Sequence, residues 1–279
     1  MNYKPFLFCI SLFISNSLFA FQPFFDNNPQ TRYAPPDPQL TDFDLEVLEL
    51  CGKWGAKVNA LDFEKMMLNN NSAPALAYIK NSLGNRIFRK AKTNKDFVQQ
   101  LRRVWFEQKG FKHVFCGEPS LNNGLGGLHY APRYWQAQDE KWAGHRALIR
   151  DFKKRPLKAC RQYYIKENIK PPIYTIGLEY KNPRNNRTQV KCLSGYHYKM
   201  SAQDILIAGT KAFKQANKKV GKNAKAACLF KTQGSKAASH YSTLVIKSRA
   251  LRTFYPMADK KPYCKKDKRN ISACFCSKL

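Results

Sequence analysis

The sequence predicts an α+β protein in which a helical N-terminal region precedes a β-rich remainder. Apolar residues recur at helical spacing up to about residue 107. After Gly110 the pattern changes to short β-type runs, many of them separated by glycine or proline. One helical segment, which begins near Ser201, interrupts these runs. Helices and strands thus fall in largely separate regions of the chain, as is typical of α+β proteins.

The N-terminus reads as an export signal followed by a leader. Residues 1–20 combine a positive charge at Lys4 with the apolar stretch Phe6–Ile14 and a plausible cleavage position at Ala20. The apolar stretch is much shorter than the roughly 20 residues that a membrane span needs. Residues 21–40 are rich in Asn, Pro and Gln and predict an extended leader. We therefore expect a secreted or periplasmic protein without a membrane span.

Three helices are expected in the N-terminal region. They cover residues 41–51, 72–83 and 94–107. Thr41 is placed to cap the first, which carries Leu45, Leu48 and Cys51 on one face. Gly84 ends the second. These apolar stripes predict core-facing helices.

Strands dominate the remainder of the chain. The predicted strands are Phe111–Phe115, Ile173–Tyr180, Thr188–Leu193, Ala226–Phe230, Tyr241–Ile246 and Leu251–Tyr255. The interrupting helix has Ser201 as its N-cap and an apolar face that includes Leu206 and Phe213. Residues 258–279 form a basic tail with three cysteines, which we expect disulfides to hold in place.

The chain is strongly basic. Its 49 Lys and Arg residues outnumber 19 Asp and Glu residues, which gives a formal net charge of +30. Loss of residues 1–20 removes one lysine and no acid, so the mature chain carries +29. Such a charge attracts RNA, DNA, anionic lipid or lipopolysaccharide, and the charge alone does not choose among them.

The cysteine count favours disulfides over a metal site. Eight cysteines remain after export, and an even number in an exported chain predicts disulfide bonds. No CxxC pair occurs, which disfavours structural zinc. The pairing of the cysteines does not follow from the sequence. The eight are Cys51, Cys116, Cys160, Cys192, Cys228, Cys264, Cys274 and Cys276.

Two histidines sixteen residues apart are the strongest candidates for catalysis. His113 and His129 each lie beside glycines and an apolar run, and we expect two short strands to bring both rings to one cleft. An unperturbed imidazole titrates at about 6.5, so two of them can share acid and base work on one phosphodiester. The other three histidines, His145, His197 and His240, are expected to be surface or internally satisfied residues.

The motifs around this pair resemble the EndoU family of uridylate-preferring endoribonucleases, which is related to the coronavirus endoribonuclease. The matching blocks are Val104–Phe106, His113–Glu118, Gly127–His129 and, far downstream, Thr253–Pro256. Each block is weakly specific, but their order and spacing agree with the family. The resemblance implies a two-lobed catalytic domain, which we place at residues 41–257 and whose helical N-terminal part resembles the family only loosely.

The resemblance also implies a catalytic triad. His129 corresponds to the base and His113 to the acid, and a lysine supplies positive charge to the reacting phosphate. Two lysines compete for this role. Lys191 lies on a predicted strand, whereas Lys199 lies just before the helix that Ser201 caps, and Lys191 is preferred. Glu118 is expected to orient a histidine or accept backbone hydrogen bonds.

Base recognition is assigned by the same resemblance to Ser194, Thr253 and Tyr255. Hydroxyl groups can bond the uracil edge, and an aromatic ring can stack on the base or ribose. Tyr255 and Phe254 alternate along one strand, so at most one of them faces a cleft.

The expected function is a secreted endoribonuclease that cuts single-stranded RNA at uridines and leaves 2′,3′-cyclic phosphate ends. RNA is the expected partner, and an immunity or inhibitor protein is a further candidate. No residue cluster shows metal-ligand spacing, so no cofactor is expected to be required. Mn²⁺ stimulation stays open, because Lys112 and Tyr130 depart from the family pattern beside the histidines. The competing hypothesis is a non-catalytic cationic protein that binds nucleic acid or acts on bacteria.

Overall fold

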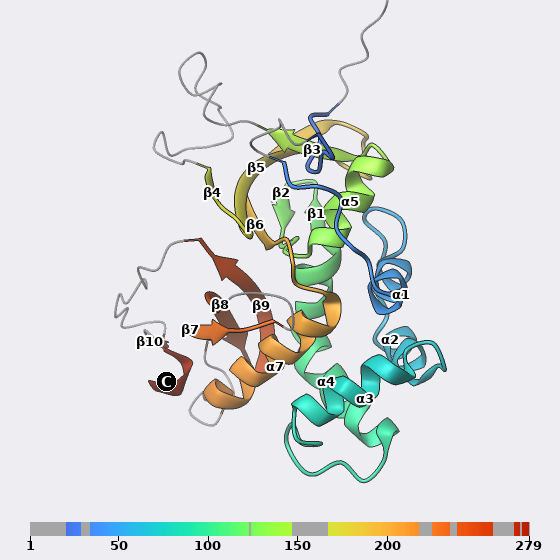
Figure 1. The fold of residues 1–279 in the computed structure, drawn as a ribbon, viewed down its shortest axis with the longest axis vertical. Coiled ribbons are helices and arrows are strands. Elements are labelled where there is room, and N and C mark those ends of the chain that lie inside the picture. Colours follow the sequence, from blue (N-terminus) through green and yellow to red (C-terminus); the bar gives the residue numbers. More distant parts are fainter. Residues whose placement is uncertain are drawn as a thin grey trace, which may run out of the picture.

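A computed structural model describes most of the chain. It covers residues 21–28, 34–122, 124–146, 167–217, 225–234, 239–258, 271–273 and 275–278. The predicted signal peptide and most of the predicted tail lie outside these residues. Two four-stranded sheets lie one above the other along the long axis, with helices α1, α2 and α3 to one side (Figure 1). The predicted α+β class is confirmed.

Four helices form the N-terminal region. They are α1 (Asp42–Cys51), α2 (Ala60–Leu68), α3 (Ala73–Ser82) and α4 (Asn94–Phe106). The three predicted helices are confirmed, and α2 was not predicted. Thr41 caps α1 in a capping box with Asp44. Leu45 was wrongly expected on the buried face: it is 51% exposed, because the buried stripe runs through Phe43 and Val47 instead.

The first sheet is antiparallel and is built around β5. Its strands are β3 (Ala143–Arg146), β4 (Asn168–Lys170), β5 (Ile173–Lys181) and β6 (Thr188–His197). β6 follows β5 along its length, while β3 and β4 share the opposite edge of β5. Helix α5 (Ala131–Asp139) contacts this sheet through β3 and belongs to the same hydrophobic cluster. Phe24 and Phe25 of the leader are 2% exposed and belong to that cluster, so this part of the leader is packed.

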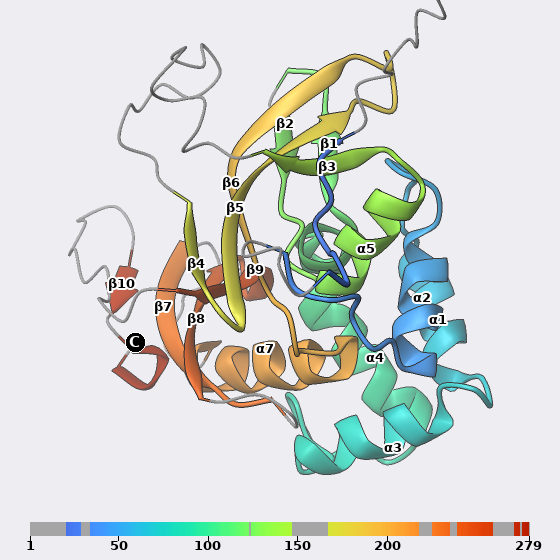
Figure 2. The ribbon, with the colours of Figure 1, turned by 45° about the horizontal axis from the view of Figure 1, so that its top comes forward.

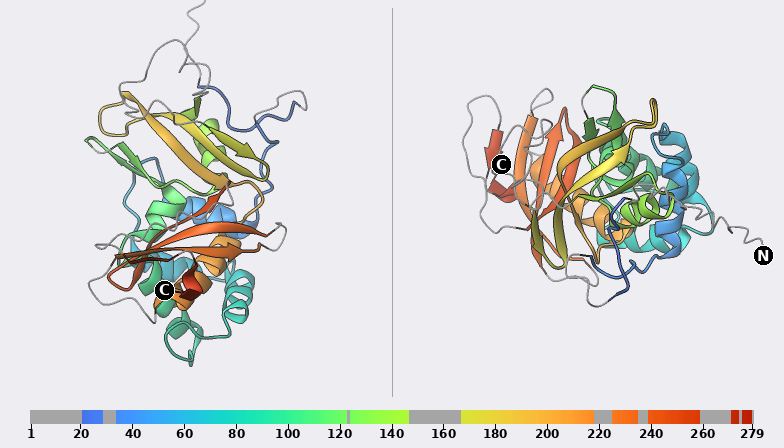
Figure 3. Two further views of the ribbon diagram at one scale, coloured as in Figure 1. Left: turned by 90° about the vertical axis from the view of Figure 1, so that its left-hand side faces the viewer. Right: turned by 90° about the horizontal axis from the view of Figure 1, so that it is seen from above.

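The second sheet has the order β10-β7-β8-β9. Its strands are β7 (Lys225–Thr232), β8 (His240–Lys247), β9 (Ala250–Met257) and β10 (Ile271–Ala273). β10 pairs parallel to β7, and the other pairs are antiparallel. Helix α7 (Ala202–Asn217) runs across the sheet (Figure 2). The side view shows the two sheets as separate layers (Figure 3), in agreement with the predicted two lobes.

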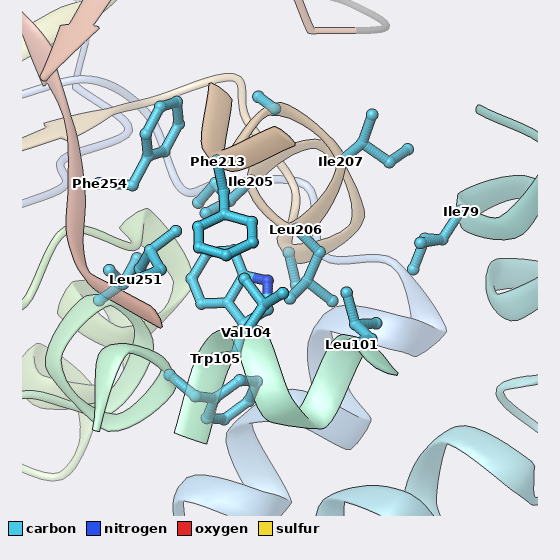
Figure 4. Close-up of a cluster of buried hydrophobic side chains, with 14 of the residues drawn as sticks. Ile79, Leu101, Val104, Trp105, Ile205, Leu206, Ile207, Phe213, Leu251 and Phe254 are labelled. Atoms are coloured by element: carbon cyan, nitrogen blue, oxygen red, sulfur yellow. The ribbon is translucent and has the colours of Figure 1, made fainter. Parts of the chain in front are cut away.

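The main core joins the second sheet to the N-terminal helices. Trp105 of α4 lies at its centre, surrounded by Leu206, Phe213 and Leu251 (Figure 4). The indole Nε1 donates to Thr210 Oγ1 at 3.0 Å, which satisfies the one polar atom of this buried ring. At Gly209, a Cβ would lie 2.8 Å from the same ring, so the glycine lets α7 approach α4 closely. Among the described residues, no helix has both the length and the apolar composition to cross a bilayer.

Disulfides connect distant elements. Cys51 of α1 is bonded to Cys116, and Cys228 of β7 is bonded to Cys276. Cys192 on β6 is also disulfide-bonded. Cys160, Cys264 and Cys274 lie outside the described residues. The expectation of disulfides is confirmed for the cysteines that the structure describes.

We expect the double variant Cys51→Ala/Cys116→Ala to be about 4 kcal/mol less stable, because the bond closes a loop with a sequence separation of 65 residues. Calorimetry should show a melting temperature roughly 10 °C lower. Cys228→Ala/Cys276→Ala is the matched control. It should also melt earlier, but it should keep its activity while folded, because only Cys116 lies on the turn that carries His113. An unchanged melting temperature in the first variant would contradict the bond.

Candidate active site

His113 lies on a short π-helix, Lys112–Cys116, and not on a strand. The predicted strand Phe111–Phe115 is therefore wrong. Phe111, Val114 and Phe115 are all fully buried, and their spacing of three and four residues is that of one helical face. The bulky side chains in this run suggested a strand, but burial on one side of a helix explains them better.

The segment that carries His129 is clamped against this helix. Leu128 N donates to His113 O at 2.7 Å, and His129 N donates to Val114 O at 2.8 Å. Gly127 has φ +67°, and a Cβ there would lie 1.7 Å from the His113 carbonyl oxygen. Only glycine fits this contact. The imidazole ring centroids of His113 and His129 are consequently 5.8 Å apart, which confirms that the two rings meet.

Two short strands do form between the histidines, but neither histidine lies on them. β1 (Glu118–Ser120) and β2 (Gly124–Gly126) pair antiparallel as a small hairpin. The hairpin places the Glu118 carboxylate beside His113, with Oε2 2.7 Å from Nδ1. This contact confirms the expectation that Glu118 orients a histidine.

Arg252 is a member of the site that sequence reasoning missed. Its Nη1 and Nη2 donate to the two oxygens of Glu118 at 3.1 and 2.5 Å, and Nη1 also donates to Gln108 O at 3.1 Å. A β-bulge explains its direction. Thr253 pairs with Val245 while Leu251 pairs with Ile246, so Arg252 is the extra residue of β9. No spacing rule in the sequence signals such a bulge.

His129 is held from its other sides as well. Its Nδ1 lies 2.9 Å from the carbonyl oxygen of Gly195, and the Tyr255 ring stacks on it with centroids 5.1 Å apart. The next residue, Tyr130, is fully buried and donates its hydroxyl to Asp44 Oδ1 at 2.7 Å. Tyr130 thus anchors the end of the His129 segment to α1.

Lys191 reaches the same place from β6. Its ammonium donates to the carbonyl oxygen of Gly127, two residues before His129 in the chain. Ser194 on the same strand donates to Leu128 O at 2.8 Å and to Gly127 O at 3.2 Å, and it is 4% exposed. Lys199 is exposed and lines a different cavity, near the start of α7. The structure therefore brings Lys191 to the histidine pair and leaves Lys199 away from it.

The two imidazoles differ in how their surroundings shift their pKa values. Burial holds the pKa of His129 well below its ordinary value of 6.5, and the charges of Lys191 and His113 add to the effect. Burial also lowers the pKa of His113, but the hydrogen bond with Glu118 opposes this. Burial would raise the pKa of Glu118, yet hydrogen bonds from His113 and Arg252 lower it to about 2. Burial lowers the pKa of Lys191 to about 7.

Thr253 and Tyr255 point to one face of β9. Phe254, between them, is 3% exposed and belongs to the main core, as the alternation of strand side chains requires. The Thr253 hydroxyl is buried and has no hydrogen-bond partner among the described residues. A buried unpaired hydroxyl costs about 1–3 kcal/mol, so a bound ligand that paired it would recover that free energy.

The other histidines have structural surroundings. His145 Nε2 lies 3.0 Å from Glu167 Oε1, which confirms that it is internally satisfied. The expectation of a surface or internally satisfied residue is wrong for His197, which is 2% exposed and whose Nε2 has no hydrogen-bond partner among the described residues. Its ring centroid lies 4.5 Å from that of His240. Within the described part of the chain, His, Cys, Asp and Glu side chains form no group of three that could hold a metal ion.

Two half-buried imidazoles beside a lysine amine form a site that can carry acid–base chemistry. A family model described as bacterial EndoU nuclease matches residues 107–258, more than half of the chain. The chain therefore belongs to the EndoU nuclease family, and the matched segment contains every residue assigned to the site. The expected family is confirmed.

No curated protein matches the chain. A solved structure, described as XendoU, a splicing independent snoRNA processing endoribonuclease, is similar at 17% identity with a TM-score of 0.45 and covers 78% of each chain.

Proposed function

We propose that the protein is a secreted endoribonuclease that cleaves single-stranded RNA, preferably at uridines, through attack of the 2′-hydroxyl. One observation carries this proposal: each imidazole is anchored through Nδ1, by Glu118 in one case and by Gly195 O in the other. Nε2 of each ring is then the nitrogen that meets the substrate. Two such nitrogens on neighbouring rings suit a reaction that needs one base and one acid.

The anchors also distinguish the roles. A carbonyl oxygen can only accept, so His129 carries its proton on Nδ1 and offers a lone pair at Nε2. With its pKa well below 6.5, His129 is neutral near pH 7 and can act as the base. His113 faces a carboxylate, which stabilises the imidazolium form that an acid needs. Geometry thus supports the same roles that the family resemblance implies.

The proposed reaction proceeds in one displacement. His129 Nε2 takes the proton of the ribose 2′-hydroxyl, and the oxygen attacks the adjacent phosphorus. His113 Nε2 gives its proton to the departing 5′-oxygen. The Lys191 ammonium stabilises the negative charge on the non-bridging oxygens. The products are a 2′,3′-cyclic phosphate and a 5′-hydroxyl.

An RNA oligomer with a single uridine tests the proposal. The oxidised mature protein should cut it after the uridine, and mass spectrometry should find a cyclic phosphate on the 5′ fragment. The same oligomer with 2′-deoxyuridine at that position should stay intact, because it lacks the nucleophile. A protein that shifts the RNA on a gel without cutting it would instead be a cationic binding protein.

Uridine preference is proposed to depend on Thr253 and Tyr255, with Tyr255 stacking and the unpaired Thr253 hydroxyl bonding the base. Ser194 already donates to the loop carbonyls, so we assign it a positioning role and only a secondary contact with substrate through its acceptor lone pairs. Thr253→Val should reduce the preference for uridine over other bases by about tenfold, the loss expected for one hydrogen bond. It should not lower stability, because it removes a buried unpaired hydroxyl. Unchanged base preference would remove Thr253 from this role.

We propose that no metal ion is required, because His129, His113 and Lys191 already provide the base, the acid and the positive charge. Enzyme treated with a chelator should keep most of its activity in a fluorescent RNA cleavage assay. Mn²⁺ added to this chelator-treated enzyme then tests for stimulation of the remaining activity. Complete loss of activity on chelation, with recovery by Mn²⁺, would show that a metal takes part in the reaction.

A further inference from the structure

A cationic cavity of about 510 Å³ adjoins the site through Glu118, the partner of His113. Its walls come from the end of α4, the open ends of β7 and β8, and the bulge of β9. Glu118 and Arg252 form the wall that it shares with His113, and Lys109, Lys225 and Lys247 line the rest. The Glu118 carboxylate therefore faces both the acid of the proposed reaction and this second space.

The lysines of this cavity form no ion pairs with the described acids. Lys225 and Lys247 lie directly opposite each other on neighbouring strands, an arrangement that like charges destabilise. Lys109, Lys225 and Lys247 are all exposed, and none forms an ion pair with a described residue.

The acids nearby do not neutralise them. Glu107, which also lines the cavity, is paired with Arg103 at 3.1 Å. Glu118 is occupied by Arg252 and His113. Three ammonium groups around one hollow, with both acids already paired, favour an anionic ligand that carries more than one charge.

We propose that this cavity binds the phosphate backbone of substrate RNA on the 3′ side of the cleaved bond. The proposal rests on the proposed function. In that reaction His113 protonates the 5′-oxygen of the departing nucleotide, so the strand beyond the leaving group exits on the His113 side. Glu118, the partner of His113, lines the cavity, whereas Gly195 and Tyr255, the contacts of His129, do not, so the lysines lie on the His113 side of the pair. Lysine ammonium groups bind phosphates as point charges and impose no base sequence, which suits a strand whose sequence is read elsewhere.

Binding of non-cleavable RNA tests the cavity without relying on turnover. The reference ligand is a short oligomer with 2′-deoxyuridine at the cleavage position and one nucleotide after it. Two longer ligands add three nucleotides, on the 3′ side in one and on the 5′ side in the other. Affinities are measured by fluorescence anisotropy over a series of salt concentrations. Cleavage of the matching all-ribose oligomers is followed in parallel.

The variant Lys225→Gln/Lys247→Gln removes the facing charges. Its matched control, Lys90→Gln/Lys231→Gln, removes two exposed lysines outside the cavity lining. Lys231 lies on the same strand as Lys225, six residues or roughly 20 Å further along. Melting temperatures of both variants establish that they are folded.

The 3′ extension should tighten binding by about tenfold in the wild type and in the control variant, as expected for two phosphate contacts. The cavity variant should lose this gain, and its salt dependence should shrink by about 1.4 in the slope of log K against log salt. The proposal would be overturned if the 3′ extension tightened binding equally in the cavity variant and the wild type. It would also be overturned if the cavity variant lost only the gain from the 5′ extension. If the wild-type protein cut none of the all-ribose oligomers, the proposed function would be refuted. The affinities for the non-cleavable ligands would still show whether the cavity binds the 3′ strand.

Discussion

Replacing either His113 or His129 by alanine is expected to lower the rate of RNA cleavage by about 10²- to 10⁴-fold. In the proposed reaction each ring contributes one proton transfer through Nε2. The rings are also held from behind, by Glu118 and by Gly195 O, so their loss removes groups that are already oriented. Single-turnover measurements with a single-uridine oligomer give the rate directly.

The double variant His113→Ala/His129→Ala should cost little more than the worse single variant, because acid and base act in one step and are not additive. His145→Gln is the matched control, since His145 bonds Glu167 and takes no part in the pair. It should retain nearly the full rate. Full activity in either single variant would remove that histidine from the mechanism.

The histidine pair could be found from the sequence because its motifs are local. His113, Glu118, Gly127 and His129 lie within seventeen residues, and the order of the blocks carried the family assignment. The geometry that makes the pair work is not local. His129 is bonded by Gly195, 66 residues away, and stacked by Tyr255 on another sheet. Sequence spacing gives no access to contacts of this kind.

The errors have a common physical origin. A short buried turn of helix and a buried strand both appear as a run of bulky apolar residues, and the run Phe111–Phe115 was assigned to the wrong one. Arg252 was missed because a single extra residue in β9 determines where it points. Tyr130, noted only as a departure from the family, proved to be a buried anchor on Asp44. In each case the direction or conformation of the residue depends on tertiary packing, which the local sequence pattern does not specify.

The choice between the two lysines has the sharpest consequence for the mechanism. Lys191→Ala is expected to lower turnover by about 10²- to 10³-fold, the usual loss when one donor to a developing oxyanion is removed. Affinity for non-cleavable RNA should change little, because one ammonium contributes little among so many basic residues. Lys199→Ala should change neither quantity, because Lys199 is exposed and lines another cavity.

The pH dependence separates a catalytic role of Lys191 from a structural one. Lys191 is charged below its pKa of about 7 and loses its charge as the pH rises through that value. His113, whose pKa lies below 6.5, loses its acid proton at lower pH. The logarithm of the wild-type rate should therefore fall with a slope of one above the pKa of His113 and a slope of two above about pH 7.

In Lys191→Ala the steeper segment should disappear, leaving a slope of one at high pH, and Lys199→Ala should retain the wild-type profile. If Lys191 only held the Gly127 carbonyl in place, other groups would produce the second slope. Lys191→Ala would then be slower at every pH, and its profile would keep that slope. Wild-type kinetics with a slope of one throughout, or an inactive Lys199→Ala beside an active Lys191→Ala, would exclude Lys191 as the group that stabilises the reacting phosphate. The measurement requires only rates between about pH 5 and 9, a range that includes the Lys191 pKa of about 7.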